Sequence, residues 1–157
     1  VIAYDPYLID GDFPAFVERA RDLHELFRLA DVVSPHVPLN DETRGMIDAT
    51  CFAAMKPRSY VVNTARGAVI NIPDLLAALD RGQLDSAGLD VLPNEPARPG
   101  ERLTEHPRVV LTPHSAFYSV ESEIELRTKA ARNLITWAQT GRPDYPVGVG
   151  RKTLLPA

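Results

Sequence analysis

Four side chains capable of chemistry each follow or close a short apolar run of the kind that forms β-strands. Asp5 follows Val1–Tyr4, Arg66 follows SYVVNTA, Asp90 lies in GLDVL and His114 ends LTPH. Polar residues are common at exposed strand ends, but chance does not predict this mix of acid, cation and imidazole. A carboxylate accepts hydrogen bonds, a guanidinium binds carboxylates, and an imidazole transfers protons near neutral pH.

The elements that must position these side chains alternate between strands and helices. Apolar runs predict strands at 1–4, 59–65, 86–92 and 108–114, with a short β-rich run at 31–39. Helical spacing predicts helices at 22–30, 48–56, 72–84 and 119–140, and a long proline-rich loop is expected at 92–108. This alternation predicts an α/β fold with a parallel sheet, in which ligands bind beyond the carboxyl ends of the strands.

Composition narrows the class of protein. The 157 residues are 45% hydrophobic and 24% charged, which are values typical of a globular domain with a real core. A net charge of −4 argues against a nucleic-acid partner, and no apolar run approaches the ~20 residues that span a bilayer. The single cysteine, Cys51, forms no internal disulfide, fits a reducing cytoplasm and is interpreted as an ordinary buried thiol.

Asp5 carries information about a cofactor. An acidic residue that closes the second strand of a dinucleotide-binding unit accepts hydrogen bonds from the adenosine ribose, and its charge repels a 2′-phosphate. The first arginine after Asp5 is Arg19, so NAD is favoured over NADP. The only glycine-rich stretch is PVGVGRKT near the end of the chain. It is a poor phosphate loop, because Arg151 replaces the expected lysine and no strand leads into it.

Several separated motifs carry a family resemblance. VVNTARGAVI, GLDVLPNEP and LTPHSAFYS resemble the D-isomer-specific 2-hydroxyacid dehydrogenases, and DPYLIDG and PHSAFYSVESEIELRTKAARNL resemble the C-terminal-binding-protein branch. The resemblance implies a Rossmann-type NAD-binding domain at 1–116, incomplete at its N-terminus because the first strand and glycine-rich turn are missing. Residues 117–157 would be a long helix and tail returning towards a substrate domain that is mostly missing. The chain is thus expected to be the C-terminal part of a longer enzyme.

The resemblance also implies an activity. It is NAD-dependent interconversion of a small 2-keto acid and a D-2-hydroxy acid by a cytoplasmic homodimer that binds neither nucleic acid nor membrane. The isolated segment is expected to be inactive.

Three residues take catalytic roles in this interpretation. Arg66 would hold the substrate carboxylate bidentately and polarise the adjacent carbonyl. Gly67 would let the backbone turn and leave room for substrate. His114 would act as the acid or base on the substrate oxygen, and Glu95 would accept a hydrogen bond from the other ring nitrogen and so fix the ring.

The resemblance places further residues beside the cofactor. Asp90 would contact the nicotinamide carboxamide and so orient the ring; the alternative is that it caps a helix or turn. Thr43 would reach the phosphates or, with equal weight, cap the following helix, and His36 is expected only to pack nearby. The predicted cofactor-binding set is Asp5, Pro38, Thr43, Thr64, Ala65 and Asp90, of which Thr64 and Ala65 would offer backbone groups to the nicotinamide ring.

One residue departs from the branch. Phe117 stands where corepressor-like members have a tryptophan, so the apolar wall remains but the indole donor is lost, and the substrate preference of that branch does not transfer. Two rival interpretations are an NAD-sensing, corepressor-like binding module with vestigial activity, and a Rossmann-like methyltransferase. The methyltransferase would need neither the Arg/Glu/His set nor NTARG.

Overall fold

The computed structural model describes residues 1–146. It divides into two compact units, Val1–Ala116 and Phe117–Ala157, which are described separately below. Apart from Pro146, the PVGVGRKT stretch lies outside the described residues.

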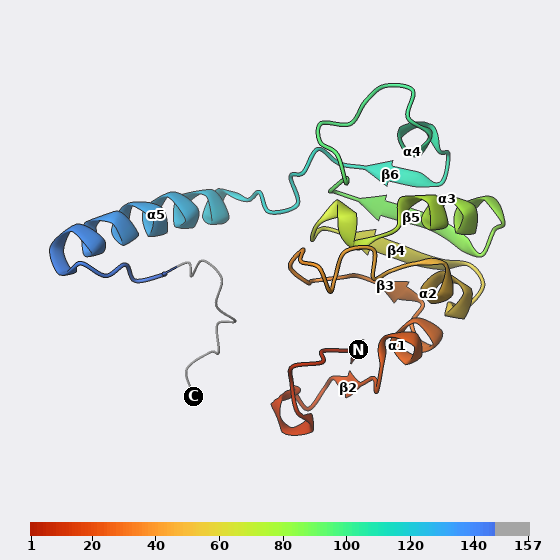
Figure 1. Cartoon of the computed structure of the whole chain (residues 1–157), viewed down its shortest axis with the longest axis horizontal. Helices are drawn as coiled ribbons and strands as arrows, with labels where there is room; N and C mark the ends of the chain where they lie inside the picture. Colours follow the sequence, from red (N-terminus) through yellow and green to blue (C-terminus); the bar gives the residue numbers. More distant parts are fainter. Residues whose placement is uncertain (147–157) are drawn as a thin grey trace. The chain divides into compact units, whose positions relative to one another are not determined.

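Parallel strands form the first unit (Figure 1). A four-stranded parallel sheet has the order β3-β4-β5-β6, and a separate parallel pair is formed by β1 and β2. The strands of the first unit are β1 Ile2–Ala3, β2 Glu18–Arg19, β3 Val32–Val33, β4 Ser59–Asn63, β5 Leu84–Leu89 and β6 Val109–Leu111. Its helices are η1 Asp10–Asp12, α1 Leu23–Leu29, α2 Ala49–Ala54, η2 Gly67–Val69, α3 Ile72–Asp80 and α4 Arg102–Glu105. The predicted α/β fold with a parallel sheet is confirmed.

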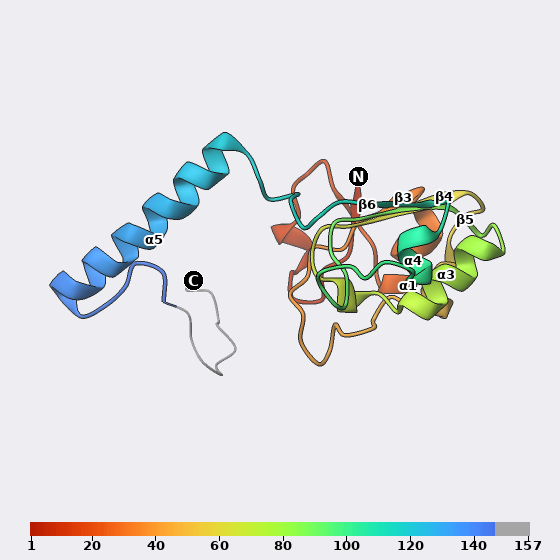
Figure 2. The same cartoon turned by 90° about the horizontal axis from the view of Figure 1, so that it is seen from above.

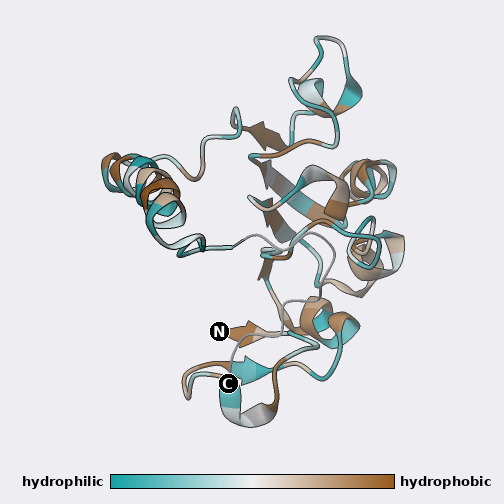
Figure 3. Cartoon of the chain, turned by 60° about the vertical axis from the view of Figure 1, so that its left-hand side comes forward, coloured by the Kyte–Doolittle hydropathy of each residue, from teal (hydrophilic) through white to brown (hydrophobic). Residues whose placement is uncertain are grey.

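Helices cover one face of the four-stranded sheet. In Figure 2, α1, α3 and α4 lie on the same side of the strands, and α2 packs between α1 and α3. The core lies between these layers and includes Phe27, Phe52, Val61, Leu75 and Leu84, each fully buried. Figure 3 shows brown, hydrophobic stretches in the strands of the sheet, with pale and teal stretches between them. On β4 the burial alternates, so Ser59, Val61 and Asn63 face the helices.

Side-chain caps explain where the helices begin. Asp22 accepts a hydrogen bond from the Glu25 amide at the start of α1, and Asp48 accepts from two amides at the start of α2. Asn71 caps α3, whose first turn also holds Pro73. These polar residues directly before apolar periodic runs are why the predicted starts agree with the structure to within one residue.

The structure differs from the local predictions in three places. The expected loop at 92–108 contains α4, which buries Leu103 against the core. The strand β2 was missed because Glu18 and Arg19 are polar and exposed, so no apolar run marks it, and its pairing with β1 includes backbone hydrogen bonds that a sequence does not reveal. The strands are also shorter than their apolar runs suggested, since β6 ends at Leu111 rather than His114.

The second unit contains the helix α5, Val120–Thr140. Ser119 caps its N-terminus in a reciprocal pair with Ser122, and Gly141 ends it in the left-handed conformation at φ 73°. Residues after the helix fold back on it, because Asn133 exchanges two hydrogen bonds with the Tyr145 backbone. In the part of the chain that the structure describes, no helix is long and apolar enough to cross a membrane.

Candidate active site

A histidine–glutamate pair lies beyond the carboxyl ends of β5 and β6. The Nδ1 atom of His114 is 2.7 Å from Oε2 of Glu95, and Oε1 of Glu95 accepts a hydrogen bond from the Leu92 amide at 2.8 Å. The His114 hydrogen bond, followed by that from Leu92, lowers the pKa of Glu95. Because an ionised carboxylate can only accept, Nδ1 carries the proton in this hydrogen bond.

The backbone of His114 is held in an uncommon conformation. Its φ is 52°, in the left-handed region that non-glycine residues rarely adopt. The His114 amide donates to the carbonyl oxygens of Asp90 and Thr112 at 2.9 and 3.0 Å, respectively. A non-glycine residue persists in this region only where its surroundings fix it, which is a common property of functional sites.

Asp90 fixes the turn that carries His114. Its carboxylate is buried and accepts hydrogen bonds from the Thr112 hydroxyl and from the amides of Ser115 and Ala116, the last two both at 2.9 Å. Burial acts to raise the pKa of Asp90, but these hydrogen bonds outweigh it and lower the pKa. The turn-cap role is therefore present in the structure, and the contact with a nicotinamide carboxamide stays a prediction.

Asn63 shapes the loop that carries Arg66. The side chain of Asn63 is buried at the end of β4. Its Nδ2 donates to the Arg66 carbonyl oxygen, and its Oδ1 accepts from the backbone amide of Ala65, both at 3.0 Å. The Arg66 side chain is exposed, and its Nη1 lies 2.6 Å from the Ala65 carbonyl oxygen. Sequence reasoning gave Asn63 no role, although a polar residue at an inward position of β4 was a usable signal.

Gly67, in the loop of Arg66, packs closely against the backbone of the loop that carries Glu95. A Cβ atom on Gly67 would lie 2.0 Å from the Leu92 carbonyl carbon and 2.3 Å from the Pro93 nitrogen. The expectation that Gly67 leaves room for substrate is therefore wrong, because the backbone of Leu92 and Pro93 occupies that space. Close backbone approach is the reason only glycine fits here.

Most of the predicted site residues line two adjoining pockets. Arg66, Glu95 and His114 line one pocket of about 290 Å³. A second pocket of about 520 Å³ is lined by residues 36–39 and 64–66, and so contains Pro38, Thr64 and Ala65. Leu39 and Arg66 line both pockets. Asp90 shares a further pocket of about 560 Å³ with Glu95 and His114.

Comparison with known proteins identifies the domain that carries these residues. The family model described as "D-isomer specific 2-hydroxyacid dehydrogenase, NAD binding domain" matches residues 1–116. The chain belongs to the D-isomer-specific 2-hydroxyacid dehydrogenase family. The NAD-binding domain predicted from the sequence is thereby confirmed, and it excludes the methyltransferase interpretation.

Relatives of known activity and structure agree with this assignment. Glyoxylate reductase of Aeropyrum pernix is 40% identical over 119 residues, which are 76% of this chain and 36% of that protein. D-mandelate dehydrogenase of Rhodotorula graminis, in a holo form, is 39% identical with a TM-score of 0.77, over 87% of this chain and 40% of that chain. An NAD-complexed family member from Lactobacillus delbrueckii is 32% identical with a TM-score of 0.80, over 94% of this chain and 48% of that chain. The chain spans about a third of the length of the curated relatives it matches.

The remaining predicted cofactor residues lie outside the two adjoining pockets. Thr43 donates its hydroxyl to the Pro38 carbonyl at 2.6 Å and accepts from the Asn40 amide. Asp48 caps α2, so the alternative that Thr43 caps that helix is wrong. Thr43 instead closes the turn that follows Pro38, and its contact with phosphates stays a prediction.

Asp5 presents a hydrogen-bond acceptor of the kind that a dinucleotide ribose requires. At the end of β1, Oδ1 of Asp5 accepts from the Tyr7 amide at 2.8 Å, and among the described residues its Oδ2 accepts no hydrogen bond. A carboxylate oxygen open to a hydroxyl donor is what a ribose requires. Within residues 1–146, no cluster of three or more His, Cys, Asp or Glu side chains could hold a metal ion.

Proposed function

We propose that the full-length protein is an NAD-dependent oxidoreductase that interconverts a small 2-keto acid and a D-2-hydroxy acid. The observation that carries this proposal is the His114–Glu95 pair, which lines one pocket with the Arg66 side chain. A proton donor beside a carboxylate-binding cation is the combination that reduction of a 2-keto acid needs.

Each side chain has a defined task in this proposal. The Arg66 guanidinium binds the substrate carboxylate through two parallel donors and draws electron density from the neighbouring carbonyl. His114 donates its Nε2 proton to the oxygen as that oxygen becomes an alkoxide, and it takes the proton back in the oxidative direction. Glu95 keeps the Nδ1 proton in place and stabilises the imidazolium. Bound NADH supplies the hydride for reduction, and NAD⁺ accepts it for oxidation.

The cofactor residues act by position. Asp5 binds the ribose hydroxyls and disfavours a 2′-phosphate, while the backbone of Thr64 and Ala65 faces the nicotinamide ring beside Pro38. Asp90 fixes the turn that carries His114, and its carboxylate contacts the carboxamide of the nicotinamide. We further propose a cytoplasmic homodimer, as expected from the sequence. The relatives are dehydrogenases and reductases, so the corepressor-like alternative gains no support from them.

The test is a keto-acid panel assayed with the full-length protein. Glyoxylate, pyruvate and phenylglyoxylate should be assayed with NADH and with NADPH, because relatives act on glyoxylate and on mandelate. We expect at least one of these acids to be reduced with NADH, giving the D-enantiomer where the product is chiral. No turnover of any 2-keto acid by protein that binds NADH would contradict the proposal.

The 157 residues alone are proposed to be inactive. Arg66 is exposed, and the side chains of His114 and Glu95 are 42% and 37% exposed. A site this open does not exclude water from the reacting atoms. Turnover by this segment at the rate of the full-length protein would show that it needs no further cover.

A further inference from the structure

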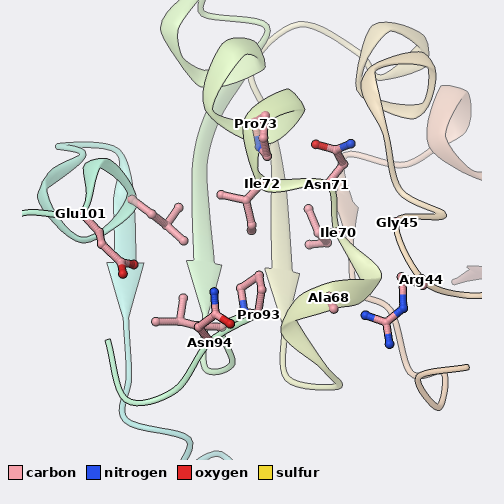
Figure 4. A pocket seen from close by; sticks show the side chains of 12 residues that line it. Arg44, Gly45, Ala68, Ile70, Asn71, Ile72, Pro73, Pro93, Asn94 and Glu101 are labelled. Atoms are coloured by element: carbon pink, nitrogen blue, oxygen red, sulfur yellow. The ribbon is translucent and has the colours of Figure 1, made fainter. Parts of the chain in front are cut away.

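A separate pocket of about 500 Å³ lies beside the first turn of α3 (Figure 4). Four segments line it, from the turn before α2, the η2–α3 connection, the loop after β5 and α4. Ile70 and Leu103, which are buried in the core, form its floor, and the partly buried Ile72 and Leu92 supply its apolar surface. A pocket of this size is comparable to those that hold small organic ligands.

Two charges of opposite sign line this pocket. Figure 4 shows Arg44 and Glu101 on opposite sides of it, with the apolar residues between them. Among residues 1–146, neither side chain has an ion-pair or hydrogen-bond partner, whereas charged neighbours such as Arg102 and Asp80 pair with each other. The pocket therefore presents one open cation and one open carboxylate.

This pocket is distinct from the catalytic one. The two share Ala68, Leu92 and Pro93, but Arg66, Glu95 and His114 do not line the pocket of Arg44 and Glu101. A 2-keto acid carries no positive charge, so it would leave Glu101 without a partner. The chemistry required here differs from that of the proposed substrate.

We propose that this pocket binds a small organic zwitterion. The carboxylate of the ligand pairs with Arg44, its ammonium pairs with Glu101, and its apolar body covers the partly exposed side chains of Ile72 and Leu92. Charge complementarity selects both ends, and the apolar surface between them selects a ligand whose charges are separated by methylene groups or similar apolar atoms.

The test uses ω-amino acids of increasing length as probes. The full-length protein, without NADH or keto acid, is titrated with 4-aminobutanoate, 6-aminohexanoate and 8-aminooctanoate by calorimetry and by methyl NMR. Hexanoate and hexylamine are the singly charged comparisons. We expect one ω-amino acid to bind roughly ten-fold more tightly than either comparison, because each lacks one charge-assisted hydrogen bond. The methyl shifts should be centred on Ile72 and Leu92.

Charge variants locate the site. Arg44→Gln and Glu101→Gln should each weaken binding by about five-fold or more, while Arg81→Gln and Glu18→Gln, at exposed positions of the first unit that do not line the pocket, leave it unchanged. The double exchange Arg44→Glu/Glu101→Arg should restore binding, because a zwitterion can reverse its direction. Equal affinity for the singly charged comparisons, or unchanged affinity in both pocket variants, overturns the proposal. The titration needs no turnover, so its outcome is independent of the proposed catalytic function.

Discussion

The backbone is fixed differently in two regions of the candidate site. One is the region around His114, the His114 corner, and the other is the region around Asp5, the Asp5 corner. At the first, buried polar groups fix the backbone, since Asn63 and Asp90 together accept or donate five hydrogen bonds in the two loops that carry Arg66 and His114. At the second, Asp5 follows a two-residue strand, and within residues 1–146 its carboxylate accepts one hydrogen bond, from the Tyr7 amide.

This difference matches two different tasks, since His114 must be preorganised for proton transfer and Asp5 must select the cofactor. Proton transfer requires donor and acceptor within hydrogen-bond reach, so displacement of His114 or Glu95 by an ångström lowers the rate steeply. Binding a ribose hydroxyl tolerates a more mobile carboxylate, because its task is to select a charge state rather than to reach a reacting atom. Changes at the His114 corner should therefore affect rate and stability, and changes at the Asp5 corner should affect cofactor choice.

The largest effect is expected for His114→Gln in the full-length protein. Loss of the proton donor should lower kcat by roughly 10²- to 10⁴-fold, with NADH binding retained. Steady-state kinetics and NADH fluorescence titration measure the two quantities. His24→Gln, on the exposed side of α1, is the matched control and should behave as wild type. Wild-type kcat in His114→Gln would remove His114 from the mechanism.

Gly67→Ala should damage both loops together. The new Cβ meets the backbone of Leu92 and Pro93 at distances no packed structure tolerates, so we expect destabilisation of about 1–3 kcal/mol or more, with a fall in kcat. Urea unfolding and kinetics are the measurements. Gly11→Ala is the control, because a Cβ there meets nothing within 4 Å. If the two alanine variants are equally stable, the two loops do not pack as closely as described.

The sequence predicted local structure well and long-range structure poorly. The starts of three helices could be predicted because a cap and the helix that it starts are adjacent in the chain. These caps are Asp22, Asp48 and Ser119. The packing of Gly67 against Leu92 depends on the parallel pairing of β4 with β5, which no local pattern reveals. For the same reason the sequence suggested only a possible cap for Asp90 and could not show which turn it holds.

Within the predicted site, the family motifs supplied pairings that spacing alone could not. Glu95 and His114 are 19 residues apart, and their 2.7 Å contact follows from the neighbouring positions of β5 and β6. Thr43 shows the opposite case. Its type allowed a helix cap, but Asp48 stands at the N-terminus of α2, and the hydroxyl of Thr43 bonds to Pro38 instead.

Asp90→Asn should have an intermediate effect that depends on pH. The amide oxygen can accept from one side, but its NH₂ group must face a backbone N–H, so we expect a loss of about 1–3 kcal/mol in stability at neutral pH. Because the pKa of Asp90 is lowered in the folded state, its contribution is complete above the ordinary value near ~3.9 and is lost as pH falls through the lowered value. Urea unfolding at several pH values should show the wild type and the variant converging in acid. A stability difference that grows in acid would contradict this assignment.

The smallest effect on rate and stability, but the clearest on selectivity, is expected for Asp5→Ser. Serine keeps an oxygen that can accept from the Tyr7 amide and from a ribose hydroxyl, yet it removes the charge that repels a 2′-phosphate. The fold should change in stability by no more than about 0.5 kcal/mol, because Asp5 lies outside the core. The ratio of kcat/KM for NADH to that for NADPH should fall roughly five- to ten-fold, since about one charge interaction is lost.

The control for that variant is Tyr7→Phe, which removes the hydrogen bond from the Tyr7 hydroxyl to Glu42 but leaves the Asp5 carboxylate and the Tyr7 amide in place. It should leave the cofactor ratio unchanged. A ratio that moves equally in both variants would mean that the loop after β1, rather than the charge of Asp5, sets the preference. A ratio that moves in neither would place the choice of cofactor elsewhere in the protein. A shift in Asp5→Ser alone, with kcat for NADH retained, is the result expected if this corner selects the cofactor while the corner of His114 carries out the chemistry.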